Sequence, residues 1–258
     1  MLAIHALPAF TDNYIWLLHD AERQRCAVVD PGSAAPVQAW LDEHPDCALE
    51  SILITHQHAD HTGGIGQLLQ RHAASVYAPA LEDIPHCSHP LHGEESIDVL
   101  GLPFQVLAVP GHTTGHIAYF HQGSDAMLFC GDTLFAGGCG RLFGGTASQL
   151  YHSLQRLARL PAETRVYCTH EYTQSNLRFA ETVEPDNVQL IERVKAVAEQ
   201  RAAGQITLPS SIGLELASNP FLRIGTPTIE QQLDRQFGAG QRSPEQSFAL
   251  LRRWKDTF

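Results

Sequence analysis

Four residues that could bind metal ions fall within one short stretch of the chain. Residues Thr55–His61 read THQHADH and follow an apolar run. Alternate side chains of an extended stretch point to the same side, so His56 and His58 can converge on one ion. The turn that follows would direct Asp60 and His61 toward a second ion. A single pair of histidines would be equally compatible with a solvated surface turn, but the whole string favours a metal site.

Three more polar side chains, His112, Asp132 and His170, each come just after an apolar run that reads as a strand. Open α/β sheets collect ligands beyond the carboxyl ends of their strands, so these three can meet the first four at one edge. Mixed imidazole and carboxylate ligation suits zinc, iron or manganese, and the two oxygens of Asp132 could bridge two ions. The 15 histidines of the chain agree with this role, because histidine is the commonest metal ligand. The sequence therefore predicts a two-metal site.

Other conspicuous polar residues have plainer interpretations. Asp30 ends an apolar run before Pro31-Gly32, and we expect it to stabilise a turn or a neighbouring ligand. His116 is expected at the start of a strand, as a hydrogen-bonded structural histidine rather than another ligand. The histidines of the Pro-containing segment 86–92 are expected at the surface.

The elements that must position these residues follow an α/β pattern up to about residue 170. Apolar runs rich in β-branched residues predict strands at 14–18, 26–29, 51–54, 104–109, 117–120, 127–130 and 166–168. Apolar residues at helical spacing predict helices at 35–43, 65–72 and 147–160.

The last third of the chain loses these strand signals and reads as helices joined by Pro- and Gly-containing turns. One helix is predicted at 188–203, and another opens with Ser243 as its cap and Pro244 at its first position, continuing to about residue 256. We therefore expect two domains, a catalytic domain at 1–172 and a helical substrate-binding domain at 173–258.

Composition and charge exclude several classes of protein. The 258 residues are 43% hydrophobic and 17% charged, which is typical of a compact globule rather than a disordered chain. A net charge of -11 without a basic run argues against a nucleic-acid partner, and no apolar stretch reaches the ~20 residues of a membrane span. The start of the chain lacks the pattern of an export signal, so we expect a cytoplasmic protein, and we also expect a monomer. The 6 cysteines show no paired spacing and are expected to be reduced, with Cys26, Cys130 and Cys168 in the core.

The candidate ligands together resemble the metal site of the metallo-β-lactamase superfamily, whose pattern THxHxDH is matched at Thr55–His61. The resemblance implies a four-layer αββα sandwich of the α/β class, followed here by a C-terminal helical domain. It also implies how the ligands divide between two ions. The first ion would take His56, His58 and His112, and the second Asp60, His61 and His170, with Asp132 as the bridge.

Further segments narrow the family to the hydroxyacylglutathione hydrolases, also called glyoxalases II. The resemblance is carried by Asp12–Tyr14, Gly131–Phe135, Gly138–Arg141, His170–Thr173 and Arg252–Asp256, nearly from end to end of the chain. It implies hydrolysis of S-(2-hydroxyacyl)glutathione thioesters. The chief substrate would be S-D-lactoylglutathione, split to glutathione and D-lactate in the second step of methylglyoxal detoxification.

The same resemblance implies a set of glutathione-binding residues. They are Arg141, Phe143, Tyr172, Arg252 and Lys255, with Asn176 as a weaker candidate. Glutathione carries two carboxylates, and an acidic protein needs local cations to hold them. Arg252 and Lys255 stand three positions apart on the predicted last helix and so share a face, for which a solvated basic helix end is the plainer alternative. Arg141 and Phe143 stand where eukaryotic members have Lys and Tyr, and Phe143 lacks the hydroxyl that could hydrogen-bond the substrate.

The implied chemistry uses two divalent metal ions, with zinc expected and with iron or manganese also suited to the ligands. Two cations stabilise a shared hydroxide that attacks the thioester carbonyl. The predicted catalytic residues are Asp132, as the bridge between the ions, and Asp60, which would orient the hydroxide. A thiolate is a good leaving group, so no strong general acid is needed.

Three other functions remain as alternatives. A β-lactamase is disfavoured by the lack of an export signal and by the helical tail. A persulfide dioxygenase with one iron would not use the second metal site, yet Asp60, His61 and His170 are all present. A non-catalytic metal-binding or nucleic-acid-processing scaffold is weakened by the complete ligand set and the negative net charge.

Overall fold

The computed structural model describes residues 2–258, which divide into two compact units. The N-terminal unit runs up to Ala108 and also takes in Thr113–Gly131. The C-terminal unit consists of Val109–His112 and Asp132–Phe258. The chain therefore passes from one unit to the other directly beside two of the predicted ligands.

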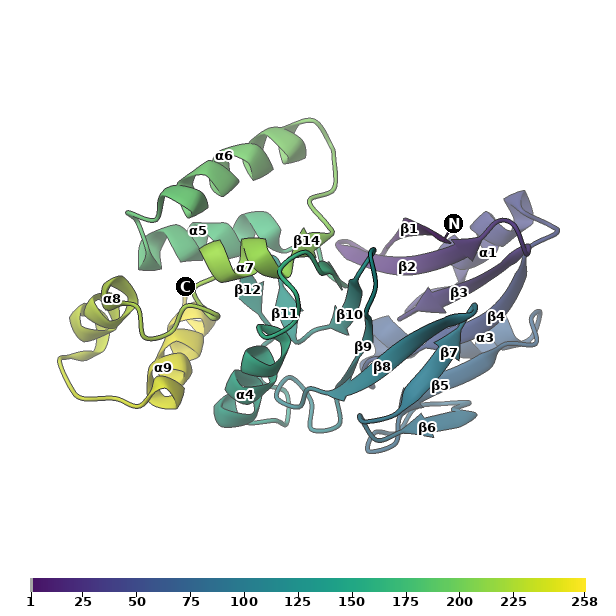
Figure 1. Cartoon of the computed structure of the whole chain (residues 1–258), viewed down its shortest axis with the longest axis horizontal. Helices are drawn as coiled ribbons and strands as arrows, with labels where there is room; N and C mark the ends of the chain where they lie inside the picture. The colour runs from purple at the N-terminus through teal and green to yellow at the C-terminus, as the bar shows by residue number, and fades with distance from the viewer. Residues whose placement is uncertain (1) are drawn as a thin grey trace. The chain divides into compact units, whose positions relative to one another are not determined.

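A sheet with strand order β1-β2-β3-β4-β5-β6 forms one layer of the N-terminal unit (Figure 1). Its strands are β1 (Leu2–Ala9), β2 (Asn13–Asp20), β3 (Arg25–Val29), β4 (Ala48–Leu53), β5 (Ser75–Pro79) and β6 (His89–Leu91). The first three strands pair antiparallel, whereas β3 to β6 run parallel to their neighbours. Parallel neighbouring strands run in the same direction, so their carboxyl ends lie at the same edge of the sheet. The segments that follow β3 and β4 therefore emerge at that edge. The amide of Asp30, just after β3, donates to the carbonyl of Leu53 at 2.9 Å.

Helices connect the parallel strands. The connection after β3 contains α1 (Ala34–Glu43), and the connection after β4 contains α2 (Ala59–Thr62) and α3 (Ile65–Leu69). The buried residues of α1, which recur about every three positions, are Ala34, Val37, Trp40 and Leu41. They pack with residues of the sheet in one apolar cluster, and each aliphatic side chain buried in this way stabilises the fold by about 1.5–3 kcal/mol. This packing fixes the sheet whose edge carries the THQHADH segment.

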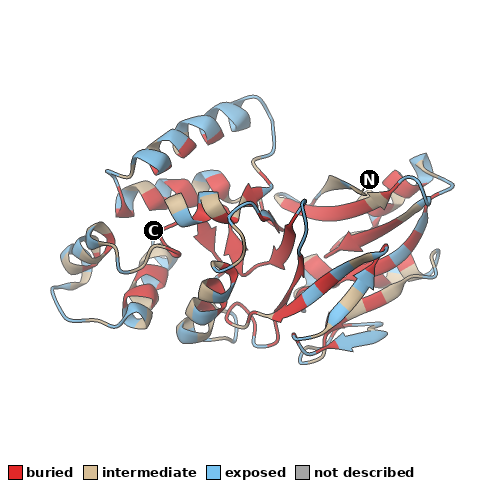
Figure 2. Cartoon of the chain, in the orientation of Figure 1, coloured by how far each residue is buried: buried red, intermediate tan, exposed pale blue. Residues whose placement is uncertain are grey.

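Four strands of a second sheet lie in the N-terminal unit in the order β10-β9-β8-β7, and each neighbouring pair of these four is antiparallel. These strands are β7 (Ser96–Val99), β8 (Leu102–Ala108), β9 (Ile117–His121) and β10 (Met127–Gly131). All residues of β9 and β10 are buried, as the red ribbon of Figure 2 shows. The hydroxyl of Tyr119 in β9 donates to the carbonyl of Ile54 at 2.8 Å, which joins the second sheet to the first.

The C-terminal unit contains two short antiparallel strand pairs and six of the helices among residues 2–258. The pairs are β11 (Leu134–Phe135) with β12 (Gly138–Cys139), and β13 (Arg165–Cys168) with β14 (Ser210–Ser211). The helices are α4 (Ala147–Leu157), α5 (Thr173–Val183), α6 (Val188–Ala202), α7 (Ile212–Ser218), α8 (Pro227–Phe237) and α9 (Pro244–Asp256). Capping boxes begin α4 and α9, where the side chains of Thr146 and Ser243 accept from the third helical amide.

The observed elements confirm the predicted α/β class with a helical C-terminal region, and each predicted strand or helix overlaps an observed one. The burial of Cys26, Cys130 and Cys168 is confirmed, and the histidines at 86, 89 and 92 are exposed as expected. Within residues 2–258, no helix combines the length and the apolar character that crossing a membrane requires.

Candidate metal centre

The THQHADH segment leaves the end of β4 and brings two imidazoles together. Nε2 of His56 and Nδ1 of His58 lie 2.9 Å apart. The ring of His56 is fully buried, and its Nδ1 lies 3.1 Å from the hydroxyl of Thr55. The two side chains are therefore close enough to share one ion, and their binding of the same ion stays a prediction.

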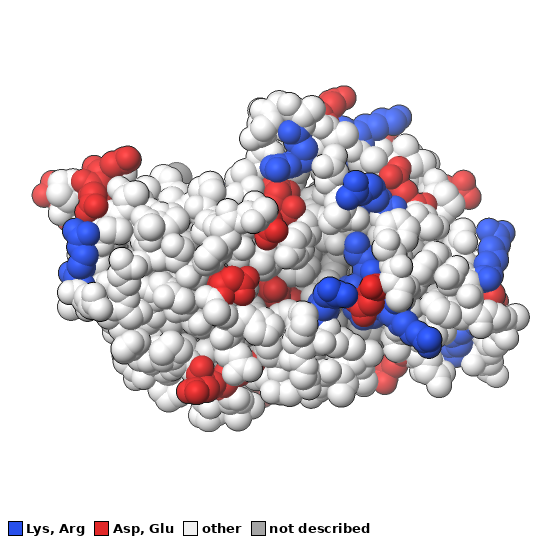
Figure 3. All heavy atoms as spheres, turned by 180° about the vertical axis from the view of Figure 1, so that it is seen from behind, with Lys and Arg blue, Asp and Glu red and all other residues white. Residues whose placement is uncertain are grey.

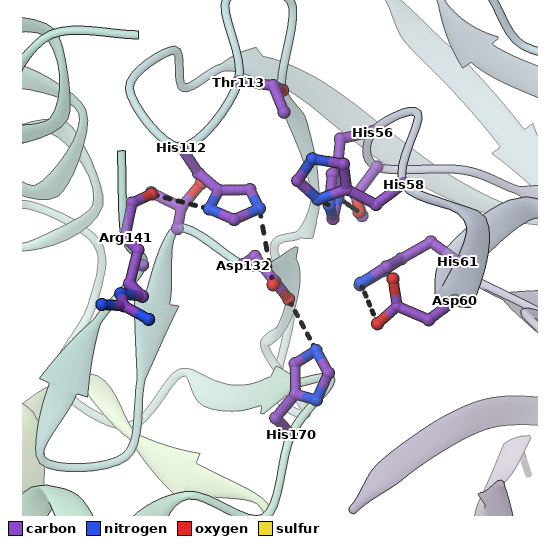
Figure 4. A network of polar contacts seen from close by, with 12 residues as sticks. His56, His58, Asp60, His61, His112, Thr113, Asp132, Arg141 and His170 are labelled. Carbon is purple, nitrogen blue, oxygen red and sulfur yellow. Dashed lines mark hydrogen bonds and ion pairs between the residues drawn. The ribbon is translucent and has the colours of Figure 1, made fainter. Parts of the chain in front are cut away.

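The second half of the segment enters α2 and places Asp60 beside His61. Oδ2 of Asp60 lies 3.5 Å from Nε2 of His61, as drawn in Figure 4. The other ring nitrogen, Nδ1, lies 3.0 Å from Oδ2 of Asp30. The same Oδ2 accepts from the hydroxyl of Thr55, and Oδ1 of Asp30 accepts from the Thr55 amide. A carboxylate beside Nδ1 favours the tautomer with its proton there, which leaves the lone pair on Nε2, the nitrogen near Asp60. The expected supporting role of Asp30 is confirmed by these contacts.

Asp60 is held from two further sides within the N-terminal unit. The side-chain amide of Asn13, at the start of β2, donates to Oδ2 of Asp60 at 3.0 Å. The backbone of Gly32 packs so closely that a Cβ there would come within 1.8 Å of the Asp60 carbonyl oxygen. Only glycine fits this position, so the Pro31-Gly32 turn fixes the start of α2.

A second group of candidate ligands lies in the C-terminal unit, where His112 and His170 flank the carboxylate of Asp132 (Figure 4). Nε2 of His112 is 3.5 Å from Oδ2 of Asp132, and Nε2 of His170 is 3.4 Å from Oδ1. The two imidazoles therefore face different oxygens of one carboxylate. That is the geometry a carboxylate needs if each oxygen is to serve a different ion.

The backbone around this carboxylate is tightly packed. Nδ1 of His112 lies 2.8 Å from the carbonyl of Arg141, to which it donates. A Cβ at Gly140 would come within 2.0 Å of the Asp132 carbonyl oxygen, and Gly131 has a φ of 47°, which favours glycine. These constraints set the orientation of both side chains before any ion is bound.

The donor set fits divalent metal ions. In His56, His61 and His112, Nδ1 lies beside a hydroxyl, carboxylate or carbonyl oxygen, so the Nε2 lone pair is the natural ligand. Metal-binding histidines typically have an outer partner of this kind, which fixes the tautomer. Imidazole and carboxylate donors of this type suit zinc, iron or manganese alike, so they do not choose among these metals.

His116 is a buried ring that stacks on His56. The ring centroids are 4.7 Å apart with an interplanar angle of 17°. The side chain precedes β9 and contributes to none of the His, Asp, Glu and Cys groups among residues 2–258 that could hold an ion. The predicted structural role of His116 is therefore supported by its packing.

Two predicted substrate-binding aromatics lie against candidate ligands of the C-terminal unit. The ring of Tyr172 stacks on His170 with centroids 4.6 Å apart and an angle of 3°. Phe143 contacts His112 edge-on at 5.4 Å, and 55% of its surface is exposed. An exposed aromatic next to a candidate ligand could contact a substrate through its ring alone.

The predicted basic residues of α9 differ in burial. Arg252 is only 3% exposed and donates to the carbonyls of Cys139 and Gly140 at 3.0 and 3.4 Å. The interpretation of this residue as part of a solvated helix end is therefore wrong, because its guanidinium packs against the β12 backbone. Lys255 is partly buried near the ring of Phe179, and burial, with a further contribution from Arg252, lowers its pKa to about 8.

Asp256 links the two predicted arginines. Its Oδ1 accepts from Arg252 at 3.1 Å and from Arg141 at 3.3 Å. Asn176, the weaker candidate, is buried, and its amide donates to the carbonyl of Ala136 at 3.2 Å. Asn176 therefore braces the turn between β11 and β12, and its role in substrate binding stays a prediction.

Comparison with known proteins gives two family matches along the chain. The metallo-beta-lactamase superfamily matches residues 10–170, and a family described as the hydroxyacylglutathione hydrolase C-terminus matches residues 171–258. Curated relatives named hydroxyacylglutathione hydrolase include those of Pseudomonas aeruginosa (strain LESB58) and Pseudomonas fluorescens (strain SBW25). Each is 57% identical to this chain over 258 residues, and the match covers 100% of both chains.

Solved structures share the fold at lower identity. A protein described as ETHE1 from Myxococcus xanthus is 26% identical with a TM-score of 0.66, and the match covers 100% of this chain and 99% of the other. A second, described as TTHA1623 in a di-iron-bound form, is 27% identical with a TM-score of 0.58, covering 85% and 100% of the two chains. Both structures therefore share the fold of this chain at about a quarter of identical residues.

Proposed function

The chain belongs to the hydroxyacylglutathione hydrolase family of the metallo-β-lactamase superfamily, and we propose that it hydrolyses S-(2-hydroxyacyl)glutathione thioesters, chiefly S-D-lactoylglutathione. The products are glutathione and D-lactate. The observation that carries the proposal is the full-length match at 57% identity to relatives with this name. The polar groups around Asp132 and in the THQHADH segment would supply the hydrolytic centre that such a reaction needs.

The proposed centre holds two divalent metal ions on seven side chains. The first ion is bound by His56, His58 and His112, the second by Asp60, His61 and His170, and Asp132 bridges them. Both three-residue sets are of the kind that could hold a metal ion. Zinc is the proposed metal, and iron or manganese would accept the same donors. The separate contacts that His112 and His170 make with the two oxygens of Asp132 support its assignment as the bridge.

The bound ions would acidify a water molecule and polarise the thioester carbonyl. The protein's part is to fix the groups around that reaction. Asp60 is the proposed residue that orients the attacking oxygen, since the amide of Asn13 holds one of its carboxylate oxygens in place. The leaving group is a thiolate, a weak base that departs without a strong general acid.

Cations of the C-terminal unit are proposed to bind the carboxylates of the glutathione moiety. Of the 17 Lys and Arg residues, 14 lie at or after Arg141. The face drawn in Figure 3 carries several Lys and Arg side chains, with acidic side chains among them. Arg141 and Lys255 are the proposed direct contacts, with the Tyr172 and Phe143 rings beside them. Arg252 would act through the backbone of Cys139 and Gly140, to which it donates.

The test is release of thiol from S-D-lactoylglutathione by metal-replete protein, followed with a chromogenic thiol reagent, beside elemental analysis of the same sample. We expect thiol release that depends on bound metal, with two ions per chain at saturation. Oxygen consumption with glutathione persulfide, together with an intact thioester, would replace the proposal with an oxidoreductase function.

Lys255 gives the proposed substrate site a pH dependence. Its pKa is lowered to about 8, so the ammonium is charged at neutral pH and loses its proton as pH rises through 8. Because the charge is proposed to hold a substrate carboxylate, KM should rise several-fold between about pH 7 and about pH 9, with kcat changed less. The profile is measured after subtracting spontaneous thioester hydrolysis. In Lys255→Arg, whose guanidinium stays charged, KM should stay level. A level KM in the unaltered protein would contradict the role of Lys255.

A further inference from the structure

A single carboxylate, that of Glu82, joins two loops of the N-terminal unit. Glu82 follows β5, and its Oε2 accepts from the amide of Gln57 at 2.6 Å. Its Oε1 accepts from the amide of Gly115 at 3.0 Å and from the hydroxyl of Thr113 in a short hydrogen bond. Glu82 lies 25 residues from Gln57 and 31 from Thr113 along the chain, so these contacts are tertiary rather than local.

Both loops carry proposed ligands of the first ion. Gln57 stands between His56 and His58, and Thr113 directly follows His112. The amide of Gln57 therefore fixes the backbone between two imidazoles, while Thr113 and Gly115 fix the segment that begins after the third. Gly115 suits this contact, because a Cβ there would come within 2.5 Å of the Glu82 side chain.

We propose that Glu82 is a positioning residue for the first metal ion, which sets the spacing between the His56–His58 segment and the segment that follows His112. The inference rests on the proposed function, since it concerns the ligands assigned there. Metal sites tolerate little error in ligand placement, and partners that orient the ligands typically change metal affinity or activity about 10–100-fold when removed. A carboxylate accepts from donors on both of its oxygens at once, which an amide of the same shape does not.

Glu95 offers a comparison within the same unit. Its carboxylate also accepts three hydrogen bonds, all of them from backbone amides, those of His92, Gly93 and its immediate neighbour Glu94, at 2.7, 2.8 and 3.0 Å. All three donors belong to its own turn before β7, and none adjoins a proposed ligand. Glu95 therefore serves local stability. A Glu95 variant also loses amide hydrogen bonds but leaves the proposed ligands in place, so it is the control for a Glu82 variant.

The experiment compares Glu82→Gln with Glu95→Gln. Glutamine keeps the length of the side chain but turns one acceptor oxygen into an NH₂ group, which opposes either the Gln57 amide or the donors of the other loop. We expect Glu82→Gln to bind one of the two ions about 10–100-fold more weakly, and to lose kcat with little change in KM. Added metal should restore much of its activity. Glu95→Gln should bind both ions as the unaltered protein does.

Affinities for the first and second ion are measured by titrating metal-depleted protein with zinc against a chromophoric chelator. Thr113→Val removes one hydrogen-bond donor to Glu82 and keeps the shape of the side chain, so it should lower the affinity for the same ion to a smaller degree. This variant provides the test if Glu82→Gln does not fold. Wild-type affinity for both ions in folded Glu82→Gln and in Thr113→Val would overturn the inference and leave the proposed function intact. An unaltered protein that bound none of zinc, iron and manganese would instead overturn the proposed function and this inference with it.

Discussion

Replacement of Asp132 by asparagine is expected to lower kcat/KM for S-D-lactoylglutathione by about 10³-fold or more. Both oxygens of Asp132 are in use, since they face Nε2 of His112 and Nε2 of His170 on opposite sides. Asparagine would present one oxygen and one NH₂ group, and the NH₂ group cannot bind a metal ion. The negative charge that Asp132 is proposed to share between two cations would be lost as well. Both effects act on the same centre, so the loss should appear mainly in kcat.

The measurement combines thiol release with elemental analysis of the purified variant. The variant is expected to retain fewer ions per chain than the unaltered protein. Asp46→Asn is the matched control, because Asp46 is exposed in the turn before β4 and does not belong to the proposed ligand set. A variant at position 132 with two ions and near-normal kcat would contradict the bridging assignment.

The sequence predicted the candidate ligands because four of them lie close together along the chain. His56, His58, Asp60 and His61 stand within six residues, and the strand before them fixes which way they point. The contacts that orient them were less visible. Asn13 was part of a family motif, but its contact with Asp60 crosses 47 positions and depends on how β2 and β4 lie in the sheet.

Glu82 had no sequence signal at all. Its partners are mainly backbone amides, which every non-proline residue has, so no residue type marks them. Arg252 was named from the family resemblance, but the sequence did not show that its guanidinium would be buried on the carbonyls of Cys139 and Gly140. Contacts between a side chain and a distant part of the backbone depend on tertiary packing. These contacts are therefore the part of the site that could be found only in the structure.

The fold shows a similar division. Strands with continuous apolar runs, such as β9 and β10, were predicted because full burial leaves an uninterrupted signal. Among the strands that were missed, β1, β5, β6 and β7 all contain exposed or partly buried residues, and β1 and β6 lie at the edges of the first sheet. The other missed strands, β11, β12 and β14, are only two residues long, which is too short to leave an apolar run in the sequence. The functional boundary between residues 172 and 173 stays a prediction, because the compact units divide the chain by contacts rather than by role.

The second prediction with a large expected effect concerns a buried ion pair in the C-terminal unit. Glu215 in α7 is 0% exposed, and its Oε1 lies 2.6 Å from a guanidinium nitrogen of Arg193 in α6. Its other oxygen accepts from the amide of Gly137 at 2.8 Å and from the side chain of Asn219 at 2.9 Å. One carboxylate therefore ties two helices to the turn between β11 and β12, just after Asp132.

Glu215→Ala is expected to lower the free energy of unfolding by about 3–5 kcal/mol, because it leaves the Arg193 charge buried without its carboxylate. Urea denaturation followed by circular dichroism measures this change. Glu199→Ala, at an exposed position of α6, should change stability by less than about 0.5 kcal/mol and serves as the control.

Removing both charges separates the ion pair from the other contacts of Glu215. Arg193→Met combined with Glu215→Met should recover part of the lost stability, since no buried charge remains, but the amide of Gly137 would still lack its acceptor. That residual deficit should appear as lower activity as well, because the turn that contains Gly137 follows the proposed bridging carboxylate by five residues. Full stability in Glu215→Ala would show that the pair contributes nothing net, and full activity in the double variant would show that the turn does not help to place Asp132.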